Sequence, residues 1–245
     1  MNTEAEITAI SVCWNTKELI ERAYDSIRRF HPDMQIIIVD GSPETSECYK
    51  FLDGLIVARK DKALTIIHVS KNIGHGRGMD FGIRHAHTPY VLFFDSDIVM
   101  VKSPVQGMLD MMEDHIYGVG YCERTGVDGH DYGVQPHHKN QPSVKYMHPY
   151  FQLVQVKEYF KYKPYFHHGA PCIQAMLDIH KKGLSDAVLK EFPGLGHTGT
   201  RQGISWKTCA GEYILHDVSG FGGTGRMRVQ NGLPHIEGEW EKIVA

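Results

Sequence analysis

One run of the sequence reads Tyr90-Val91-Leu92-Phe93-Phe94-Asp95-Ser96-Asp97, an apolar and aromatic stretch that ends on two carboxylates in an i, i+2 spacing. Short runs of aromatic and β-branched residues are typical of buried strands. Open α/β sheets bind their ligands outside the carboxyl ends of such strands. We therefore predict that Asp95 and Asp97 face a binding site.

The two carboxylates suit a hard divalent cation. Mg²⁺ and Mn²⁺ take oxygen donors, usually one or two protein carboxylates together with water and substrate phosphate. An Asp-x-Asp turn can also simply cap the next turn of the chain, so both interpretations stay open at this point. An EF-hand loop is excluded because Val99 and Met100 stand where another oxygen ligand and the loop glycine are required.

The composition indicates a globular chain without bulk attraction to polyanions. With 245 residues and 42% hydrophobic content, the chain can bury a full core as one large domain or as one domain with a lobe. The formal net charge of -3 and the pI of about 6.6 give no general affinity for nucleic acid or anionic membranes.

Cysteine usage and apolar stretches bear on the compartment. The five cysteines are odd in number, widely separated and free of any C-x-x-C pair, which fits reduced thiols better than a disulfide or zinc framework. The first residues are polar and acidic, and no apolar stretch approaches the roughly 20 residues that a spanning helix needs. We expect a soluble cytoplasmic protein without a transmembrane segment.

Strands and helices alternate through the first half of the chain. Strands are predicted over 7–14, 35–39, 64–69 and 90–94. Helical periodicity follows the first three of them, and Asn15 with Glu18 three residues later resembles the cap at the start of the first helix. The alternation predicts an α/β fold with a parallel sheet and right-handed crossovers.

Asp40 ends a predicted strand, as Asp95 does. The carboxyl ends of parallel strands meet at one edge of the sheet, so both acids are expected there. Asp40 is suited to accept hydrogen bonds from a nucleotide base or ribose. The alternative is that it bonds its own backbone in the turn Asp40-Gly41-Ser42-Pro43.

A glycine-rich segment, Asn72-Ile73-Gly74-His75-Gly76-Arg77-Gly78-Met79-Asp80, follows a predicted strand and opens a helix. It departs from the Rossmann fingerprint because the third glycine stands at 78 instead of 79 and no acid closes a second strand at the expected distance downstream. The Walker pattern is also absent. A glycine-rich helix start that carries Arg77 remains suited to bind phosphate, with a plain tight turn as the alternative.

The second half of the chain is less regular. Helical periodicity covers 104–115 and 169–182, and strands are predicted over 116–122 and 151–156. The segment 123–148, rich in Gly, His, Pro and Asp, resembles a mobile loop. A short strand ending at His216 leads into a glycine loop that carries Arg226. We interpret the doublets His137-His138 and His167-His168 as surface or hydrogen-bonded histidines, because their spacing matches no known ligand pattern.

Several of these pieces, taken in order, resemble family 2-like glycosyltransferases of the GT-A fold. The resemblance is good over 7–105, weaker over 213–226 and poor between. It implies one GT-A domain over 1–245, with a nucleotide-sugar-binding half at 1–105 and an acceptor-side half at 106–245. It rests on the following segments: Ile10-Ser11-Val12 leading to Asn15, Ile36 to Ser42, Asn72-Ile73-Gly74 with Gly78 and Asp80, and Phe93 to Asp97.

The resemblance implies a nucleotide-sugar donor, for which we expect a UDP-sugar. It places Asp40 at the base and ribose, and the DXD motif Asp95-Ser96-Asp97 at the metal and diphosphate, with Asp97 also in a catalytic role. It adds His216 as a late metal or diphosphate ligand, and an imidazole ligand favours Mn²⁺ over Ca²⁺. Mg²⁺ is the alternative ion. The other donor-binding residues expected are Asn72, Gly74, Arg77, Asp80 and Arg226.

The acceptor side departs from the family. Inverting members usually carry an acidic pair as general base at the start of the helix after the acceptor strand, and here Pro171 and Cys172 stand in that place. A histidine of the 167–168 doublet substitutes, or Asp178 acts from another register, or the enzyme retains anomeric configuration and needs no such base. We predict that His168 contacts the reacting hydroxyl, since a neutral imidazole can act as base near pH 7.

The leading hypothesis is a metal-dependent glycosyltransferase, of the hexosyltransferase type, that moves a sugar from a nucleoside-diphosphate sugar to an acceptor hydroxyl. A saccharide, a lipid, a protein or a nucleic acid stays open as the acceptor. One rival is a sugar-phosphate nucleotidyltransferase, which normally needs a glycine-rich loop with Arg and Lys after the first strand, and Cys13-Trp14-Asn15-Thr16 offers none. The other rival is a non-catalytic nucleotide-sugar-binding module.

Overall fold

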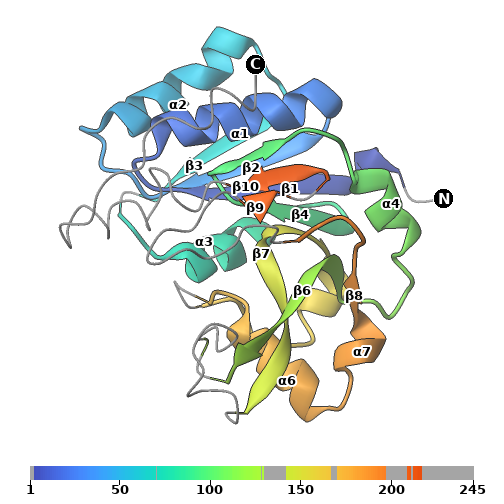
Figure 1. Cartoon of the computed structure of the whole chain (residues 1–245). Helices are drawn as coiled ribbons and strands as arrows, with labels where there is room; N and C mark the ends of the chain where they lie inside the picture. Colours follow the sequence, from blue (N-terminus) through green and yellow to red (C-terminus); the bar gives the residue numbers. More distant parts are fainter. Residues whose placement is uncertain are drawn as a thin grey trace.

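The computed structural model describes residues 3–69, 71–127, 129, 142–166, 170–196, 209–210 and 212–216 (Figure 1). The first half is the alternation predicted from the sequence. Its strands are β1 (Ile7–Cys13), β2 (Gln35–Asp40), β3 (Leu64–His68) and β4 (Tyr90–Phe94), and its helices are α1 (Lys17–Phe30), α2 (Glu47–Arg59) and α3 (His75–Ile83).

The main sheet has the strand order β3-β2-β1-β4-β7-β6-β8. Strands β1 to β4 pair in parallel, which confirms the prediction for the first half. In contrast, β7 (Ser143–Gln155) runs antiparallel to β4, and β6 (Gly118–Gly126) runs antiparallel to β7. The edge strand β8 (Leu189–Glu191) is parallel to β6. The sheet is therefore mixed, with its parallel half carrying the acids predicted for the site.

A smaller sheet and several short helices complete the described part of the chain. The smaller sheet has the order β5-β10-β9, formed by β5 (Ile98–Met100), β10 (Ile214–His216) and β9 (Cys209–Ala210). The short helices are the 3-10 helix Glu4–Glu6, α4 (Val105–Asp110), α5 (Val156–Tyr159), α6 (Ile173–Lys181) and α7 (Ser185–Val188).

Strands β1, β2 and β4 are buried on both faces, because helices cover each side of the sheet (Figure 1), whereas the edge strand β3 is only partly buried. Neighbouring residues enter opposite cores: Ala9 belongs to the core beneath α1 and α2, whereas Ile10 belongs to the core that includes Met79 of α3. Leu92 and Phe93 of β4 divide in the same way. Burial on both faces explains why these strands are continuous apolar runs instead of alternating ones.

The loop expected over 123–148 is wrong at both ends. The ladder between β6 and β7 continues from Cys122 opposite Met147 to Gly126 opposite Ser143, while residues 128 and 130–141 lie outside the described part. Val144 and Tyr146 are buried and alternate with the half-buried Ser143 and Lys145, a strand pattern that the surrounding His, Pro and Gly residues obscured. Pro149 lies where the register shifts, a position at which a sheet tolerates proline.

The expected cap of the first helix is also wrong. Thr16, not Asn15, occupies the N-cap position of α1, and Asn15 has a left-handed backbone with φ of 53°. Asparagine tolerates this conformation better than most residues. Its backbone N–H donates to Ser42 Oγ at 2.7 Å, so the loop after β1 is fixed to the turn after β2.

Replacing Gly78 with alanine is expected to destabilise the fold by about 1–3 kcal/mol, the range for overpacking a core. A Cβ at Gly78 would lie 2.6 Å from Cγ1 of Val12, a short branched side chain with little freedom to move away. Gly54 in α2 is the matched control, because a Cβ there meets nothing within 4 Å. Gly54→Ala should instead stabilise by roughly 0.5–1 kcal/mol through helix propensity. Urea denaturation of both variants tests the pair, and equal effects would contradict the close packing of α3 on β1.

Candidate active site

The predicted acids lie at one edge of the sheet. Asp40 is the last residue of β2, and Asp95 directly follows β4. Both strands pair in parallel with β1, which lies between them and ends at Cys13. The glycine-rich start of α3 is close to the same edge, because His75 contacts Asp95. The topology therefore brings three separate sequence motifs together.

The DXD turn is fixed by backbone and side-chain contacts. The N–H of Asp95 donates to the carbonyl of Tyr150 at 2.9 Å, and the Thr16 hydroxyl donates to Ser96 Oγ at 3.4 Å. The Asp95 side chain is 17% exposed and its Oδ1 lies 3.2 Å from His75 Nε2. Asp97 is half-buried in the turn before β5. Two carboxylates thus lie close to the surface on a turn held from several sides.

The backbone of His216 returns to this turn from more than a hundred residues downstream. Strand β10 pairs antiparallel with β5, and His216 lies opposite Ile98, the residue after Asp97. The side chain of His216 lies outside the described part of the structure. The strand return predicted for the C-terminal region is therefore present, and ligation by the imidazole stays a prediction.

Asp40 is buried more deeply than Asp95, the acid at the end of β4. Its side chain has 0% exposure, its Oδ1 accepts from the Ser42 N–H at 3.0 Å, and its Oδ2 lies 2.9 Å from His68 Nδ1. Because an ionised carboxylate only accepts hydrogen bonds, Nδ1 of His68 carries the proton. A carboxylate has about four lone-pair sites, so Asp40 keeps acceptor capacity.

His68 is a candidate that the sequence did not reveal. It ends β3, opposite Asp40 in the ladder, and its ring stacks on Tyr49 with centroids 3.8 Å apart. Its Nε2 is buried and has no hydrogen-bond partner among the described residues. A buried ring nitrogen without a partner beside Asp40 is suited to meet a polar group of a bound nucleotide.

The glycine-rich segment forms a tight turn into α3. Oδ1 of Asn72 accepts from the Gly74 N–H at 2.9 Å, and Gly74 has a φ of 87°, which favours glycine. The guanidinium of Arg77 lies over the Phe166 ring at 4.2 Å. Asn72 and Gly74 thus shape the start of a helix, where backbone N–H groups favour anions.

Asp80 is engaged within the protein. Its carboxylate accepts from Arg84 at 2.9 and 3.1 Å and from the Tyr159 hydroxyl at 2.7 Å. These contacts connect α3 to α5. They satisfy the hydrogen-bonding capacity of the Asp80 carboxylate within the protein, so its presence needs no bound ligand. A donor-binding role for Asp80 stays a prediction that its contacts do not support.

On the acceptor side, Cys172 cannot replace a carboxylate base. It is buried, and burial raises the pKa of its thiol to about 12, so the thiol stays neutral at physiological pH. Asp178 on α6 pairs with Lys182 at 3.7 Å. His167, His168 and Arg226 lie outside the described residues, and their roles stay predictions.

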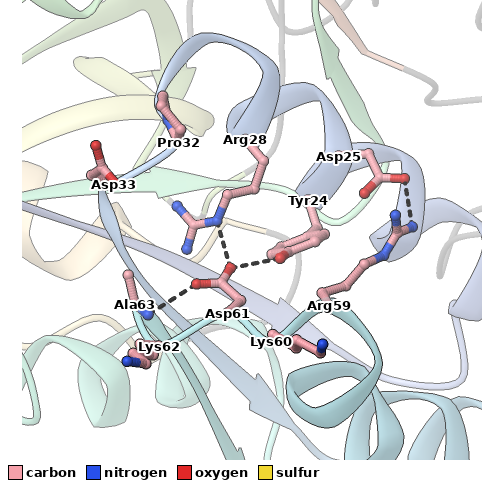
Figure 2. Close-up of a pocket in the computed structure, with 10 residues that line it drawn as sticks. All are labelled: Tyr24, Asp25, Arg28, Pro32, Asp33, Arg59, Lys60, Asp61, Lys62 and Ala63. Atoms are coloured by element: carbon pink, nitrogen blue, oxygen red, sulfur yellow. Dashed lines mark hydrogen bonds and ion pairs between the residues drawn. The ribbon is translucent and has the colours of Figure 1, made fainter.

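A hollow at the opposite end of the strands has a different character. Its volume is about 480 Å³, and it lies where α1 and α2 end and β3 begins (Figure 2). Four of its charged side chains are paired with one another: Arg28, together with the Tyr24 hydroxyl, donates to Asp61, and Arg59 donates to Asp25. The hollow lies at the opposite end of the strands from the edge that carries Asp40 and Asp95, which we call the donor edge, so we assign it a structural role.

Replacing Asp61 with alanine should destabilise the protein by about 2 kcal/mol, because it removes the charged acceptor of the largely buried Arg28. Burial acts to raise the pKa of Asp61, but the hydrogen bonds from Tyr24 and Arg28 outweigh it and hold the pKa below its usual value. The contribution of Asp61 is therefore present above pH 4 or so and is lost as the pH falls through the lowered pKa.

Urea denaturation at pH 7 and at acidic pH tests this expectation. Asp33→Ala is the control, because Asp33 is an exposed carboxylate that lines the same hollow. It should change the free energy of unfolding by less than about 0.5 kcal/mol. Equal effects of the two substitutions at pH 7 would contradict a specific role for Asp61.

Comparison with solved structures of known proteins defines the fold class of this chain. A mannosyltransferase from Pyrobaculum calidifontis in complex with GDP-Man and Mn²⁺ superposes with a TM-score of 0.56, at 13% identity over 77% of this chain and 55% of that one. Glucosyl-3-phosphoglycerate synthase from Mycobacterium tuberculosis in complex with UDP superposes with a TM-score of 0.54, at 17% identity over 80% and 73%. At these identities the likeness establishes the fold, which is GT-A.

The family follows from the sequence match. Residues 8–178 match the model of Glycosyl transferase family 2, so the chain belongs to this family. A protein of Mycobacterium tuberculosis (strain CDC 1551 / Oshkosh) named "Putative glycosyltransferases" is 26% identical over 129 residues, which are 50% of this chain and 36% of that protein. An uncharacterized glycosyltransferase of Rickettsia bellii (strain RML369-C) is 25% identical over 128 residues, 51% and 18% respectively. The matched region is thus a minor part of these curated relatives.

The structure also bears on membrane association. Within the described ranges, none of the helices has the length and apolar character needed to cross a bilayer.

Proposed function

We propose that this chain transfers a sugar from a nucleoside-diphosphate sugar to an acceptor hydroxyl. The observation that carries the proposal is the convergence of Asp40, Asp95 and the start of α3 at the carboxyl edge of β2, β1 and β4. Family membership supports it, as do the GDP-Man and UDP in the similar solved structures. A UDP-sugar is the donor that we propose, with a GDP-sugar as the competitor to test.

The residues of the DXD turn fit a divalent cation. Asp95 and Asp97 offer hard carboxylate oxygens, and both side chains retain some exposure, which leaves room for the water and phosphate ligands that Mg²⁺ and Mn²⁺ require. These two acids, with His216 as a third ligand, would hold the ion. When bound, it supplies positive charge that stabilises the leaving diphosphate.

The chain's own residues would bind and orient the donor. His75 contacts Asp95 and so fixes the position of one carboxylate. The turn of Asn72 and Gly74 begins α3, and the backbone N–H groups at a helix start favour a phosphate. Arg77 and Arg226 would add positive charge, and Asp40 with His68 would hold the base and ribose.

The acceptor half carries the base in this proposal. We assign His168 to the reacting hydroxyl, because Cys172 stays a neutral thiol and Asp178 pairs with Lys182. Product anomer analysis by NMR shows whether a base is required. If His168→Ala transfers sugar at the wild-type rate across pH 6 to 8, His168 is not that base.

Two further features belong to the same proposal. We propose one functional unit over 1–245, with the donor bound by 1–105 and the acceptor by 106–245. We also propose a cytoplasmic location, supported by the free thiols of the described cysteines, since reduced thiols fit that compartment.

A thermal-shift panel of nucleoside diphosphates and nucleotide-sugars with Mn²⁺ tests the function, because a ligand at 100 times its Kd adds about 2.7 kcal/mol. Donor turnover then separates the alternatives. A transferase slowly releases free sugar and nucleoside diphosphate. A nucleotidyltransferase would release pyrophosphate from a triphosphate and a sugar phosphate, and a binding module would do neither. Either of the last two results would reject the proposal.

A further inference from the structure

Three buried side chains with metal-binding chemistry meet beneath the donor edge. Cys13 ends β1, Asp40 ends β2, and Cys48 lies in the first turn of α2. The two sulfurs are 3.3 Å apart, and one ligand atom from each of the three residues lies within 4.8 Å of the others. Their exposures are 1%, 0% and 3%. This cluster is separate from the carboxylates of the DXD turn.

The backbone fixes the cluster from three elements. Cys13 and Asp40 are direct neighbours in the parallel ladder, and the N–H of Gly41 donates to the carbonyl of Cys13 at 2.9 Å. The hydroxyl of Ser46 accepts from the Tyr49 N–H and so caps α2, which places Cys48 in its first turn. The three donors are therefore positioned by regular structure, as a preorganised site requires.

We propose that Cys13, Cys48 and Asp40 form a binding site for a thiophilic divalent cation of the Zn²⁺ or Cd²⁺ type. Two thiolates and one carboxylate are a soft donor set that selects these ions over Mg²⁺ and Mn²⁺. In a tetrahedral site with metal–sulfur bonds of about 2.3 Å, the sulfurs lie about 3.8 Å apart. The observed pair must open by roughly half an ångström to accept the ion.

The surroundings supply what such a site needs. His68 Nδ1 and the Ser42 N–H hold the two oxygens of Asp40, as outer contacts hold a ligating carboxylate. The Thr16 hydroxyl lies 3.2 Å from the sulfur of Cys13, and a water could complete the four ligands of the ion. Binding replaces two S–H protons, which leave to solvent, by one divalent ion. Because all three residues are buried, access requires a local opening of the chain around them.

The site would couple to the donor edge through Asp40. The ion would take one of the acceptor sites that Asp40 keeps for a nucleotide, so the metal should oppose donor binding. This coupling rests on the proposed function, whereas the metal site itself does not.

Cadmium titration of the whole chain, stripped of metal and kept reduced with a phosphine, tests the site. We expect one Cd²⁺ per chain with the ultraviolet charge-transfer band of cadmium thiolate. Cys13→Ser and Cys48→Ser should each weaken binding by about a hundredfold or more, and Asp40→Asn by about tenfold. Cys122→Ser is the matched control, because Cys122 is a half-buried thiol on β6 outside the cluster.

The outcomes separate the possibilities. A band that persists unchanged in Cys48→Ser, or that disappears in Cys122→Ser, overturns the site. If a serine variant does not fold by circular dichroism, Cys48→Ala provides the same test with a residue of lower polarity. Calorimetry of UDP with and without Zn²⁺ then tests the coupling: Zn²⁺ should weaken UDP binding in the wild type and leave it unchanged in Cys48→Ala. If no nucleotide binds in the absence of Zn²⁺, the proposed function fails while the cadmium result stands.

Discussion

Asp97→Ala is expected to lower Mn²⁺-dependent sugar transfer by at least about a hundredfold, because a metal stabilises the charge of the transition state by several kcal/mol. The side chain lies on a half-buried turn at the edge of the sheet and supports little packing. The free energy of unfolding should therefore stay within about 0.5 kcal/mol of the wild type. Initial rates with saturating donor, measured with Mn²⁺ and with EDTA, test the expectation.

Two comparisons sharpen this experiment. Asp33→Ala removes an exposed carboxylate at the opposite end of the strands and should transfer sugar at the wild-type rate. His216→Ala should weaken Mn²⁺ binding more modestly than Asp97→Ala, since the carboxylates would remain. If a metal-soaked crystal shows density at Asp97 with His216 turned away, the three-residue site is wrong and the carboxylate site stands. Activity that survives both EDTA and Asp97→Ala would reject both.

Asp40→Ala should weaken nucleotide binding by about ten- to a hundredfold with or without metal, the effect of losing a hydrogen bond to a charged acceptor worth about 1.5–3 kcal/mol. The substitution also leaves the buried N–H of Ser42 and Nδ1 of His68 without an acceptor. A loss of folding stability is therefore expected as well, and Asp40→Asn is the gentler variant because it keeps the size of the side chain.

Isothermal calorimetry with UDP measures the affinity of each folded variant. Asp53→Asn is the matched control, since Asp53 is an exposed acid on α2, the helix that carries Cys48. It should bind UDP as the wild type does. Unchanged affinity in folded Asp40→Asn and Asp40→Ala would remove Asp40 from the donor site and leave it as a structural acid that orients His68.

The sequence by itself determined the parallel half of the sheet and the position of its acids. Apolar runs such as 90–94 can be recognised in the sequence because both faces of the central strands are buried, and the abrupt change to Asp95 marks the strand end. Parallel pairing then requires that Asp40 and Asp95 reach the same edge. These features depend on local pattern and on chain direction, which one sequence contains.

The tertiary structure alone decided which distant side chains meet. Strand β7 joins β4 antiparallel through residues 151–155, and its ladder with β6 continues into the segment 123–148, where the composition concealed it. The Tyr159 hydroxyl donates to the carboxylate of Asp80, 79 residues earlier in the chain. Cys48 contacts Cys13 across 35 residues, although no C-x-x-C spacing predicts that pair. Such contacts depend on how helices pack against a sheet, because packing brings together residues whose separation along the chain follows no period.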